Sequence, residues 1–286
     1  MGKRSQGVVA VGGLSLATER SAVADPAPSA DGSALRSAIG AWLVGVDAAI
    51  CSVIAGDLPR QSLLRLSQSG IDLTRIRAVP QDTPAENLHP TADQLASLSP
   101  DWSVHVCGMP IRHQRDLVRA VTGRTAAVTL GTLHREPEDE LEVPALLDLA
   151  SQCDVLLLGR SEVASLWPGE PPREVLRTMA KAGVRAAVIT LGVGGSIGIR
   201  DGRISWMPAY PVDARGGLGG GDVYAGAFAA VYAGDRDLTR SMAWASAAAS
   251  MVLEVQSPQE AISEFSRSTV DYRARALQTE AAGSER

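Results

Sequence analysis

Residues 186–195 are Ala-Ala-Val-Ile-Thr-Leu-Gly-Val-Gly-Gly, an apolar run followed by three closely spaced glycines. The short, partly β-branched run predicts a buried strand, and the glycines predict a sharp turn after it. A dinucleotide-binding fold would need G-x-G-x-x-G leading into a helix, whereas residues 196–200 predict another strand. A Rossmann-type NAD site is therefore disfavoured. Taken alone, the glycines are also explained by a strand end and a turn that bind nothing.

Similar apolar runs recur along the chain and alternate with segments of helical periodicity. This alternation predicts β-α-β units and a mostly parallel sheet covered by helices on both faces. A hairpin is expected around Asp201-Gly202, and the Ala-rich segments 222–232 and 239–254 predict two packed helices. The other strands are expected at 8–11, 48–54, 104–107, 126–130 and 154–158, and the other helices at 34–43, 58–68, 111–122, 143–152 and 173–182.

The first apolar run, residues 8–11, has two interpretations. Lys3 precedes it and Ala-Val-Ala follows at 22–24, as in a secretory leader with its cleavage site. Gly12 interrupts the apolar stretch, however, and Glu19 falls where a cleavage region is usually uncharged. We therefore favour a buried first strand and a cytoplasmic protein. No run of 18 apolar residues exists, so no membrane span is expected.

The composition limits the classes of protein that fit. Of 286 residues, 45% are hydrophobic and 21% charged, as in a globular domain, and the net charge of −5 without a basic run argues against a nucleic-acid partner. The two lysines, Lys3 and Lys181, follow no Gly-rich loop and lie in no predicted strand, which excludes Walker-type NTPases and protein kinases. The scattered Cys51, Cys107 and Cys153 predict reduced core thiols, and no zinc-ligand spacing occurs.

A second glycine cluster, residues 216–221, leads into Asp222 and an Ala-rich helix. Five of its six residues are glycine, which lets the backbone approach a ligand closely. Consecutive N–H groups together with the positive end of a helix form a cradle for an anion such as phosphate. The alternative is that Asp222 is only an N-cap and the glycines a flexible connector.

The order of these features resembles the ribokinase-like, or PfkB, family of sugar and nucleoside kinases. T-x-G-x-x-G at 190–195 precedes the hairpin, and Gly-Gly-Gly-Asp-Val-Tyr-Ala-Gly-Ala at 219–227 matches the end of the family signature D-T-x-G-A-G-D. The resemblance covers nearly the whole chain. It implies one domain, residues 1–286, with a ribokinase-like α/β/α sandwich, a mostly parallel central sheet and a small lid or flap. The polar segments 14–33 and 78–100 are the lid candidates, and the tail after about residue 276 is expected to be mobile.

The resemblance implies ATP-dependent transfer of the γ-phosphoryl group to a hydroxyl. By match to the motif, Asp222 would be the base that accepts the hydroxyl proton. Gly219, Gly220 and Gly221 would form the anion hole for the transferring phosphoryl group. Backbone amides can supply this charge stabilisation without a lysine.

The resemblance also implies a nucleotide site after the buried strand. Thr190, Gly192 and Gly195 would bind the phosphates, and the small side chain of Ala247 would leave room for an adenine. Mg²⁺ would bridge the phosphates, with Glu162 acting through water. A monovalent cation near Asp213 and a homodimer formed through the lid are further expectations from the family.

Several family positions differ in this chain. The Asp expected near the end of the first strand has no counterpart around Ala17, and N-x-x-E is present as Gly-Arg-Ser-Glu at 159–162. The G-G-x-x-x-N segment becomes residues 31–36, which makes Gly32 and Arg36 the candidate substrate contacts. The guanidinium of Arg36 suits a carboxylate or phosphate, so an anionic or unusual substrate is the hypothesis. Alternatively, Arg36 is a solvated residue at a helix start.

Three functions therefore remain open, and no membrane or nucleic-acid partner is expected for any of them. The first is an active small-molecule kinase acting on a sugar, nucleoside or related metabolite. The second is a catalytically silent relative that binds a nucleotide or metabolite and acts as a partner or regulator. The third is an unrelated α/β binding module.

Overall fold

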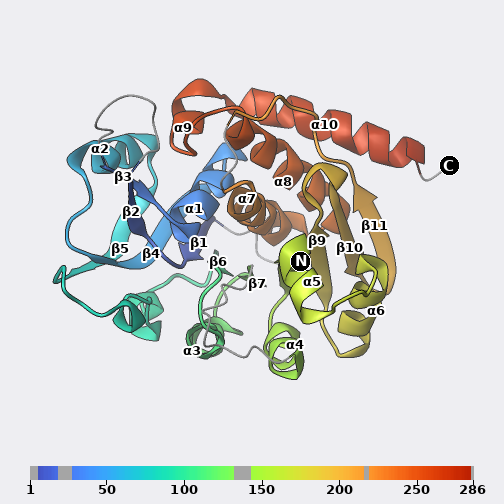
Figure 1. The fold of residues 1–286 in the computed structure, drawn as a ribbon, viewed down its shortest axis with the longest axis horizontal. Helices are drawn as coiled ribbons and strands as arrows, with labels where there is room; N and C mark the ends of the chain where they lie inside the picture. Colours follow the sequence, from blue (N-terminus) through green and yellow to red (C-terminus); the bar gives the residue numbers. More distant parts are fainter. Residues whose placement is uncertain (1–5, 19–27, 132–142, 216–218, 285–286) are drawn as a thin grey trace.

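The computed structural model describes residues 6–18, 28–131, 143–215 and 219–284 (Figure 1). Its centre is a nine-stranded sheet in the order β11-β10-β9-β8-β7-β6-β1-β4-β5. From β9 to β5 every neighbouring pair is parallel, and β10 is antiparallel to both of its neighbours. The strands are β1 Gly7–Val11, β4 Asp47–Ala55, β5 Asp72–Val79, β6 Trp102–Val106, β7 Val128–Leu130, β8 Val155–Gly159, β9 Ala186–Thr190, β10 Ser196–Arg200 and β11 Arg203–Met207.

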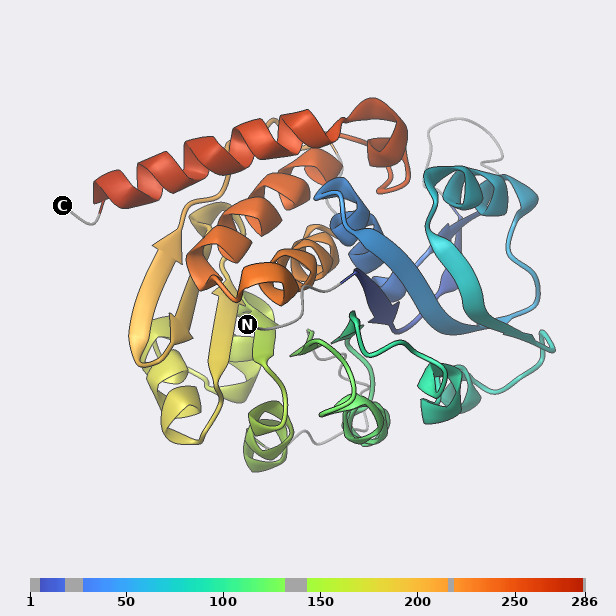
Figure 2. The ribbon, with the colours of Figure 1, turned by 180° about the vertical axis from the view of Figure 1, so that it is seen from behind.

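Helices cover both faces of this sheet, and Figure 2 shows the same arrangement from behind. One face carries α1 Ser33–Leu43, α2 Arg60–Ser69, α7 Gly220–Asp235, α8 Leu238–Leu253, α9 Glu260–Glu264 and α10 Arg267–Ser284. The other carries α3 Ile111–Val121, α4 Val143–Ser151, α5 Arg160–Leu166 and α6 Pro172–Lys181. The α/β/α sandwich and the mostly parallel sheet expected from the sequence are confirmed.

Strand β1 forms the middle of the molecule. It pairs in parallel with β4 on one side and β6 on the other. Val8 and Ala10 face the α1 side of the sheet, and Val9 and Val11 face the α3 side. Because alternate residues of a strand point to opposite faces, this short apolar run contributes to both hydrophobic cores. The strand interpretation of residues 8–11 is confirmed.

Helices α1 and α7 pack closely because each has a glycine at the contact. A Cβ atom on Gly40 of α1 would overlap the carbonyl oxygen of Val223 in α7. Close packing without a side chain in between brings the first turn of α7 against α1. The start of α7 carries Asp222, so this crossing positions a predicted site residue.

The two predicted lid segments adopt different structures. Strands β2 Ser15–Thr18 and β3 Pro28–Asp31 form a separate two-stranded antiparallel sheet. Segment 78–100 instead continues from the end of β5 through the 3₁₀ turns η1 Ala85–Asn87 and η2 Ala92–Leu95, and Leu95 is buried on the α3 side. Gln94 Nε2 donates to the carbonyl oxygens of Ser52 and Arg75. This second segment therefore packs against the sheet and adds no strand to the flap.

The structure adds elements that the sequence analysis did not expect, namely β5, α5, α9 and α10. The tail predicted to be mobile after about residue 276 is corrected, because α10 continues to Ser284 and buries Leu277 and Ala281. The cysteines are buried and unpaired, as predicted. Among the helices that the structure describes, none has the length and apolar character to cross a bilayer.

Candidate active site

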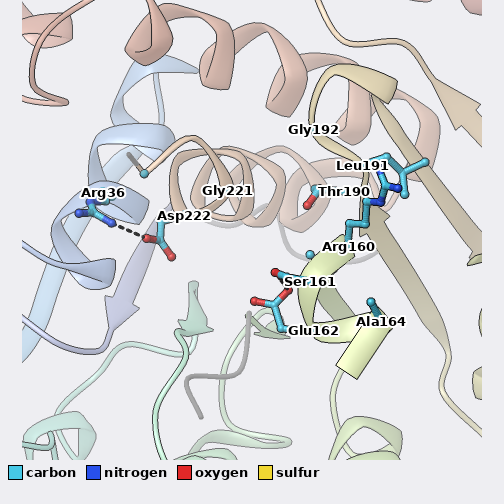
Figure 3. A pocket seen from close by; sticks show the side chains of 12 residues that line it. Arg36, Arg160, Ser161, Glu162, Ala164, Thr190, Leu191, Gly192, Gly221 and Asp222 are labelled. Atoms are coloured by element: carbon cyan, nitrogen blue, oxygen red, sulfur yellow. Dashed lines mark hydrogen bonds and ion pairs between the residues drawn. The ribbon is translucent and has the colours of Figure 1, made fainter. Parts of the chain in front are cut away.

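A cavity of about 660 Å³ opens where β8 and β9 end and α7 begins (Figure 3). The carboxyl edge of a parallel sheet is the usual position of a ligand site in such folds. Asp222 and Arg36 lie on one side of the cavity, Thr190 and Arg160 on the other, and Glu162 between them. The described residues that line it are Arg36, Gly159, Arg160, Ser161, Glu162, Ala164, Thr190, Leu191, Gly192, Gly219, Gly221 and Asp222.

The glycines before Asp222 shape one wall of the cavity. Gly219 is the N-cap of α7 in a left-handed conformation with φ 99°, and a Cβ there would lie 2.6 Å from Cδ of Arg36. A Cβ on Gly221 would meet nothing within 4 Å. The first N–H groups of a helix have no partner within the helix and carry the positive end of its dipole. The first turn of α7 therefore has N–H groups without partners inside the helix, and its Gly221 opens onto the cavity; residues 216–218 lie outside the described residues.

Asp222 is the third residue of α7 and makes no capping hydrogen bond, so the N-cap interpretation is wrong. Its side chain is 19% exposed, and Oδ2 accepts a hydrogen bond of 3.3 Å from Nη1 of Arg36. The other carboxylate oxygen turns toward the cavity in Figure 3. Burial raises the pKa of Asp222, Arg36 opposes this rise, and the nearby charges of Asp31 and Glu162 add to it. The net effect is a carboxyl pKa above the ordinary value.

Arg36 is neither solvated nor available to an anionic substrate in the way its motif position suggested. Nε donates to Oδ1 of Asp31 at 2.7 Å and Nη2 donates to Oδ2 of the same residue. Together with Asp222, the group holds two carboxylates and one guanidinium, so negative charge is in excess. Its guanidinium is therefore already paired and is less available to an anionic substrate. The structure therefore argues against the anionic-substrate hypothesis, and Asp31 is the partner that the sequence analysis missed.

Gly32 has a structural role at the start of α1. Its φ of 133° is one that side-chain-bearing residues rarely adopt, and a Cβ there would overlap the carbonyl oxygen of Gly13. It turns the chain from β3 into α1. Gly32 is not among the described residues that line the cavity, in contrast to the predicted substrate contact.

Of the residues predicted to bind nucleotide, the structure brings two to the cavity. Thr190 ends β9, and Gly192 follows with φ 61° and open space at its Cβ position. Gly195 lies outside the described lining and packs so closely that a Cβ would overlap the carbonyl oxygen of Met207. Ala247 of α8 is fully buried in the hydrophobic core and is not among the described residues that line the cavity.

Gly159, which stands where the family motif has an amide, lies close to the carboxylate of Glu162. A Cβ on Gly159 would overlap Oε2 of Glu162, so the carboxylate lies over the glycine where a longer side chain would stand. The carboxylate lines the cavity. Arg160 also lines it, and sequence reasoning missed this residue although it lies inside the altered motif. Among the residues that the structure describes, no cluster of three or more His, Cys, Asp or Glu could hold a metal ion.

The fold and this cavity define a phosphotransferase of ribokinase-like architecture. The model of the pfkB family carbohydrate kinases matches residues 120–264, half of the chain. A cytidine kinase of Thermococcus kodakarensis is 23% identical over 229 residues, which are 72% of this chain and 81% of the relative. The chain therefore belongs to the pfkB family of carbohydrate kinases, a class of phosphotransferases with an alcohol acceptor.

Solved structures agree in fold. Aminoimidazole riboside kinase of Salmonella enterica, in complex with aminoimidazole riboside and an ATP analogue, has a TM-score of 0.79 at 14% identity and covers 93% of this chain and 99% of its own. A putative ribokinase II of E. coli in complex with ATP and Mg²⁺ has a TM-score of 0.73 at 17% identity and covers 96% and 99%. The third alternative, an unrelated α/β module, is wrong, and these findings do not favour a silent relative.

Proposed function

We propose that this protein transfers the γ-phosphoryl group of ATP to a hydroxyl of a neutral sugar or nucleoside, with Asp222 as the base. The observation that carries the proposal is the position of Asp222 on the cavity wall, one residue after the open backbone of Gly221. A buried carboxylate beside a helix N-terminus combines a proton acceptor with charge stabilisation for a phosphoryl group.

The chemical step uses these groups as follows. Asp222 accepts the proton of the acceptor hydroxyl through the oxygen that faces the cavity. The hydroxyl oxygen bonds to the γ-phosphorus, the bond from that phosphorus to the β–γ bridging oxygen breaks, and ADP leaves with the electron pair. The backbone of Gly219, Gly220 and Gly221 stabilises the charge on the transferring group. A raised pKa suits a general base, because it holds the accepted proton more firmly.

The donor would occupy the side of the cavity formed by Thr190, Gly192 and Arg160. The open backbone at Gly192 permits close approach of phosphates, and the exposed guanidinium of Arg160 supplies the positive charge. A Mg²⁺ ion fits this donor set, because it keeps several waters and takes few protein ligands, here the Glu162 carboxylate through water. When bound, it neutralises charge on the phosphates.

The acceptor is proposed to be neutral because of the charges around Asp222. A sugar acid or sugar phosphate would meet excess negative charge, because the two carboxylates of Asp31 and Asp222 share the single positive charge of Arg36. The relatives named as cytidine and aminoimidazole riboside kinases support ribosides as first probes.

The β2–β3 flap is proposed to cover the acceptor and to pair with a second copy of the chain. A two-stranded sheet leaves strand edges that can add further strands. Light scattering tests this association, with a dimer mass as the expected result and a monomer mass at high protein concentration as the contrary one.

The proposed activity is tested by ADP release with ATP and Mg²⁺ against cytidine, aminoimidazole riboside, ribose, fructose, gluconate and ribose 5-phosphate. Turnover is expected with at least one neutral acceptor and with neither anion. Asp222→Asn should abolish turnover while nucleotide binding, followed by thermal shift, persists. Turnover by Asp222→Asn contradicts the assigned base, turnover with the anions alone contradicts the acceptor class, and nucleotide binding without turnover on any acceptor favours the silent alternative.

A further inference from the structure

Arg36 joins two carboxylates that are distant in the sequence. Asp31, at the end of β3, accepts two hydrogen bonds from one edge of the guanidinium. Asp222, in the first turn of α7, accepts one from Nη1 at 3.3 Å. Figure 3 shows the guanidinium beside the carboxylate of Asp222. The side chain on α1 thus connects the flap to the helix that carries the proposed base.

The packing around Arg36 limits where its guanidinium can lie. The left-handed Gly219 leaves room for the side-chain stem, since a Cβ there would lie 2.6 Å from Cδ. The next residue, Ser37, donates from Oγ to the backbone carbonyl oxygen of Asp222 at 3.1 Å. The Arg36 side chain is only 19% exposed. Arg36 is therefore held by its stem, by Asp31 and by the contact between α1 and α7.

The charged and titratable groups that face Asp222 come from four elements. Arg36 on α1 is the cation, and Asp31 on β3 and Glu162 on α5 are the carboxylates. Cys107, directly after β6, is a buried thiol whose pKa is raised to about 12 by burial and by Asp222, so it stays neutral. Arg36 is thus the only positive charge, among the described groups named here, that favours the ionised form of Asp222.

We propose that Arg36 is a positioning residue for the base: gripped by Asp31, it holds one oxygen of an ionised Asp222 carboxylate and leaves the other for the acceptor hydroxyl. This inference rests on the proposed function, in which Asp222 accepts the hydroxyl proton. Fixing one oxygen restricts rotation of the carboxylate, so the second oxygen keeps a constant place in the cavity. The positive charge offsets the cost of keeping a carboxylate ionised in a buried position.

The first test measures the protonation of Asp222 in the ligand-free protein, with no substrate required. NMR titration follows the side-chain carboxyl carbons of ¹³C-labelled aspartate, and Asp222→Asn assigns the resonance. In Arg36→Gln the titration midpoint of Asp222 should move to higher pH, and Arg36→Lys should restore part of the change. An unchanged midpoint in Arg36→Gln overturns the proposal. Arg36→Lys keeps a cation, and the titration midpoint of Asp222 is measured in this variant if Arg36→Gln fails to fold.

A matched control separates the contact from the general field of the cavity. Arg160→Gln removes the same charge from the same cavity, across from Asp222. It should move the midpoint much less than Arg36→Gln, and an equal shift overturns the proposal, because the effect would then need no contact.

Asp31→Asn tests whether the ion pair with Asp31 holds the guanidinium of Arg36 in place. Removing one like charge alone lowers the pKa of Asp222, whereas release of the guanidinium raises it. The proposal expects the midpoint to rise, and a fall would show that Asp31 acts only as a charge.

The second test measures catalysis with the acceptor that the ADP-release panel identifies. Arg36→Gln should lower kcat by about tenfold or more at slightly acidic pH, with recovery as the pH rises and Asp222 ionises. A change in KM alone, with an unaltered pH profile of kcat, overturns positioning in favour of acceptor binding. If the panel yields no acceptor, the proposed function fails, while the NMR titration still decides the role of Arg36.

Discussion

A Cβ atom on Gly226 of α7 would overlap the carbonyl oxygen of Ser37 in α1. Gly40 makes the reciprocal approach to Val223, so each helix offers one glycine to the other. Ser37 directly follows Arg36 and bonds the backbone of Asp222. The closeness of two helices therefore sets the geometry of the proposed base and its cation.

Gly226→Ala should destabilise the protein and weaken catalysis together. The added methyl meets backbone that cannot move aside without separating α1 from α7, at a cost of about 1–3 kcal/mol. Gly234→Ala is the matched control, since its Cβ meets nothing within 4 Å in the same helix and should add about 0.5–1 kcal/mol through helix propensity. Denaturant unfolding measures the free energy of unfolding of both variants. Equal stability of the two variants would contradict the packing argument.

Gly221→Ala should leave the fold intact and impair phosphoryl transfer. Its Cβ also meets nothing within 4 Å, but this space is the cavity rather than bulk solvent. A methyl there would displace the transferring group, and a displacement of about 1 Å can lower the rate by about 100-fold. Unfolding curves and kcat are compared with those of Gly234→Ala. Normal turnover by Gly221→Ala would argue against an anion cradle at this turn.

Much of the architecture followed from hydrophobic patterning. Residues 8–11 and 186–190 are apolar runs buried on both faces of a parallel sheet, and they were predictable as strands. Strand β5 was not, because it lies at the sheet edge and alternates with arginines such as Arg75 and Arg77. Helix α10 has a weakly apolar sequence whose burial depends on packing against α8. Such elements owe their structure to tertiary contacts that local pattern does not encode.

The candidate site also contains both residues that the sequence predicts and residues whose role depends on tertiary packing. Asp222, Gly221, Thr190 and Gly192 lie within short motifs, and the structure brings them to one cavity. The partnership of Asp31 with Arg36 depends on the turn at Gly32 and on α1 packing, so spacing alone could not reveal it. Ala247 lies in the hydrophobic core, and the sequence could not indicate this, since a small residue in a helix is equally suited to close packing and to lining a site.

The stability of the native protein should depend on pH through Asp222. Because its folded pKa is raised above the ordinary value of about 3.9, the folded state binds the proton more tightly than the unfolded state. This contribution is fully present below about pH 4 and is lost as the pH rises through the raised pKa. Relative to Asp222→Asn, the native protein should therefore lose unfolding free energy with rising pH. A difference that does not vary with pH would mean that the carboxyl pKa is unshifted.

Arg160 should contribute to nucleotide affinity rather than to stability. It is exposed on the first turn of α5 and lines the cavity beside Thr190 and Gly192. Loss of its charge-assisted hydrogen bonds to a phosphate should weaken ATP binding by about three- to tenfold, reduced by solvent screening. Arg173→Ala is the control, because Arg173 is also exposed, on the neighbouring α6, but is not among the described lining residues. Calorimetric titration with an ATP analogue at two salt concentrations compares the nucleotide affinities of Arg160→Ala and Arg173→Ala. The effect of Arg160→Ala should shrink at high salt, and equal affinities for the two variants would place the phosphates away from α5.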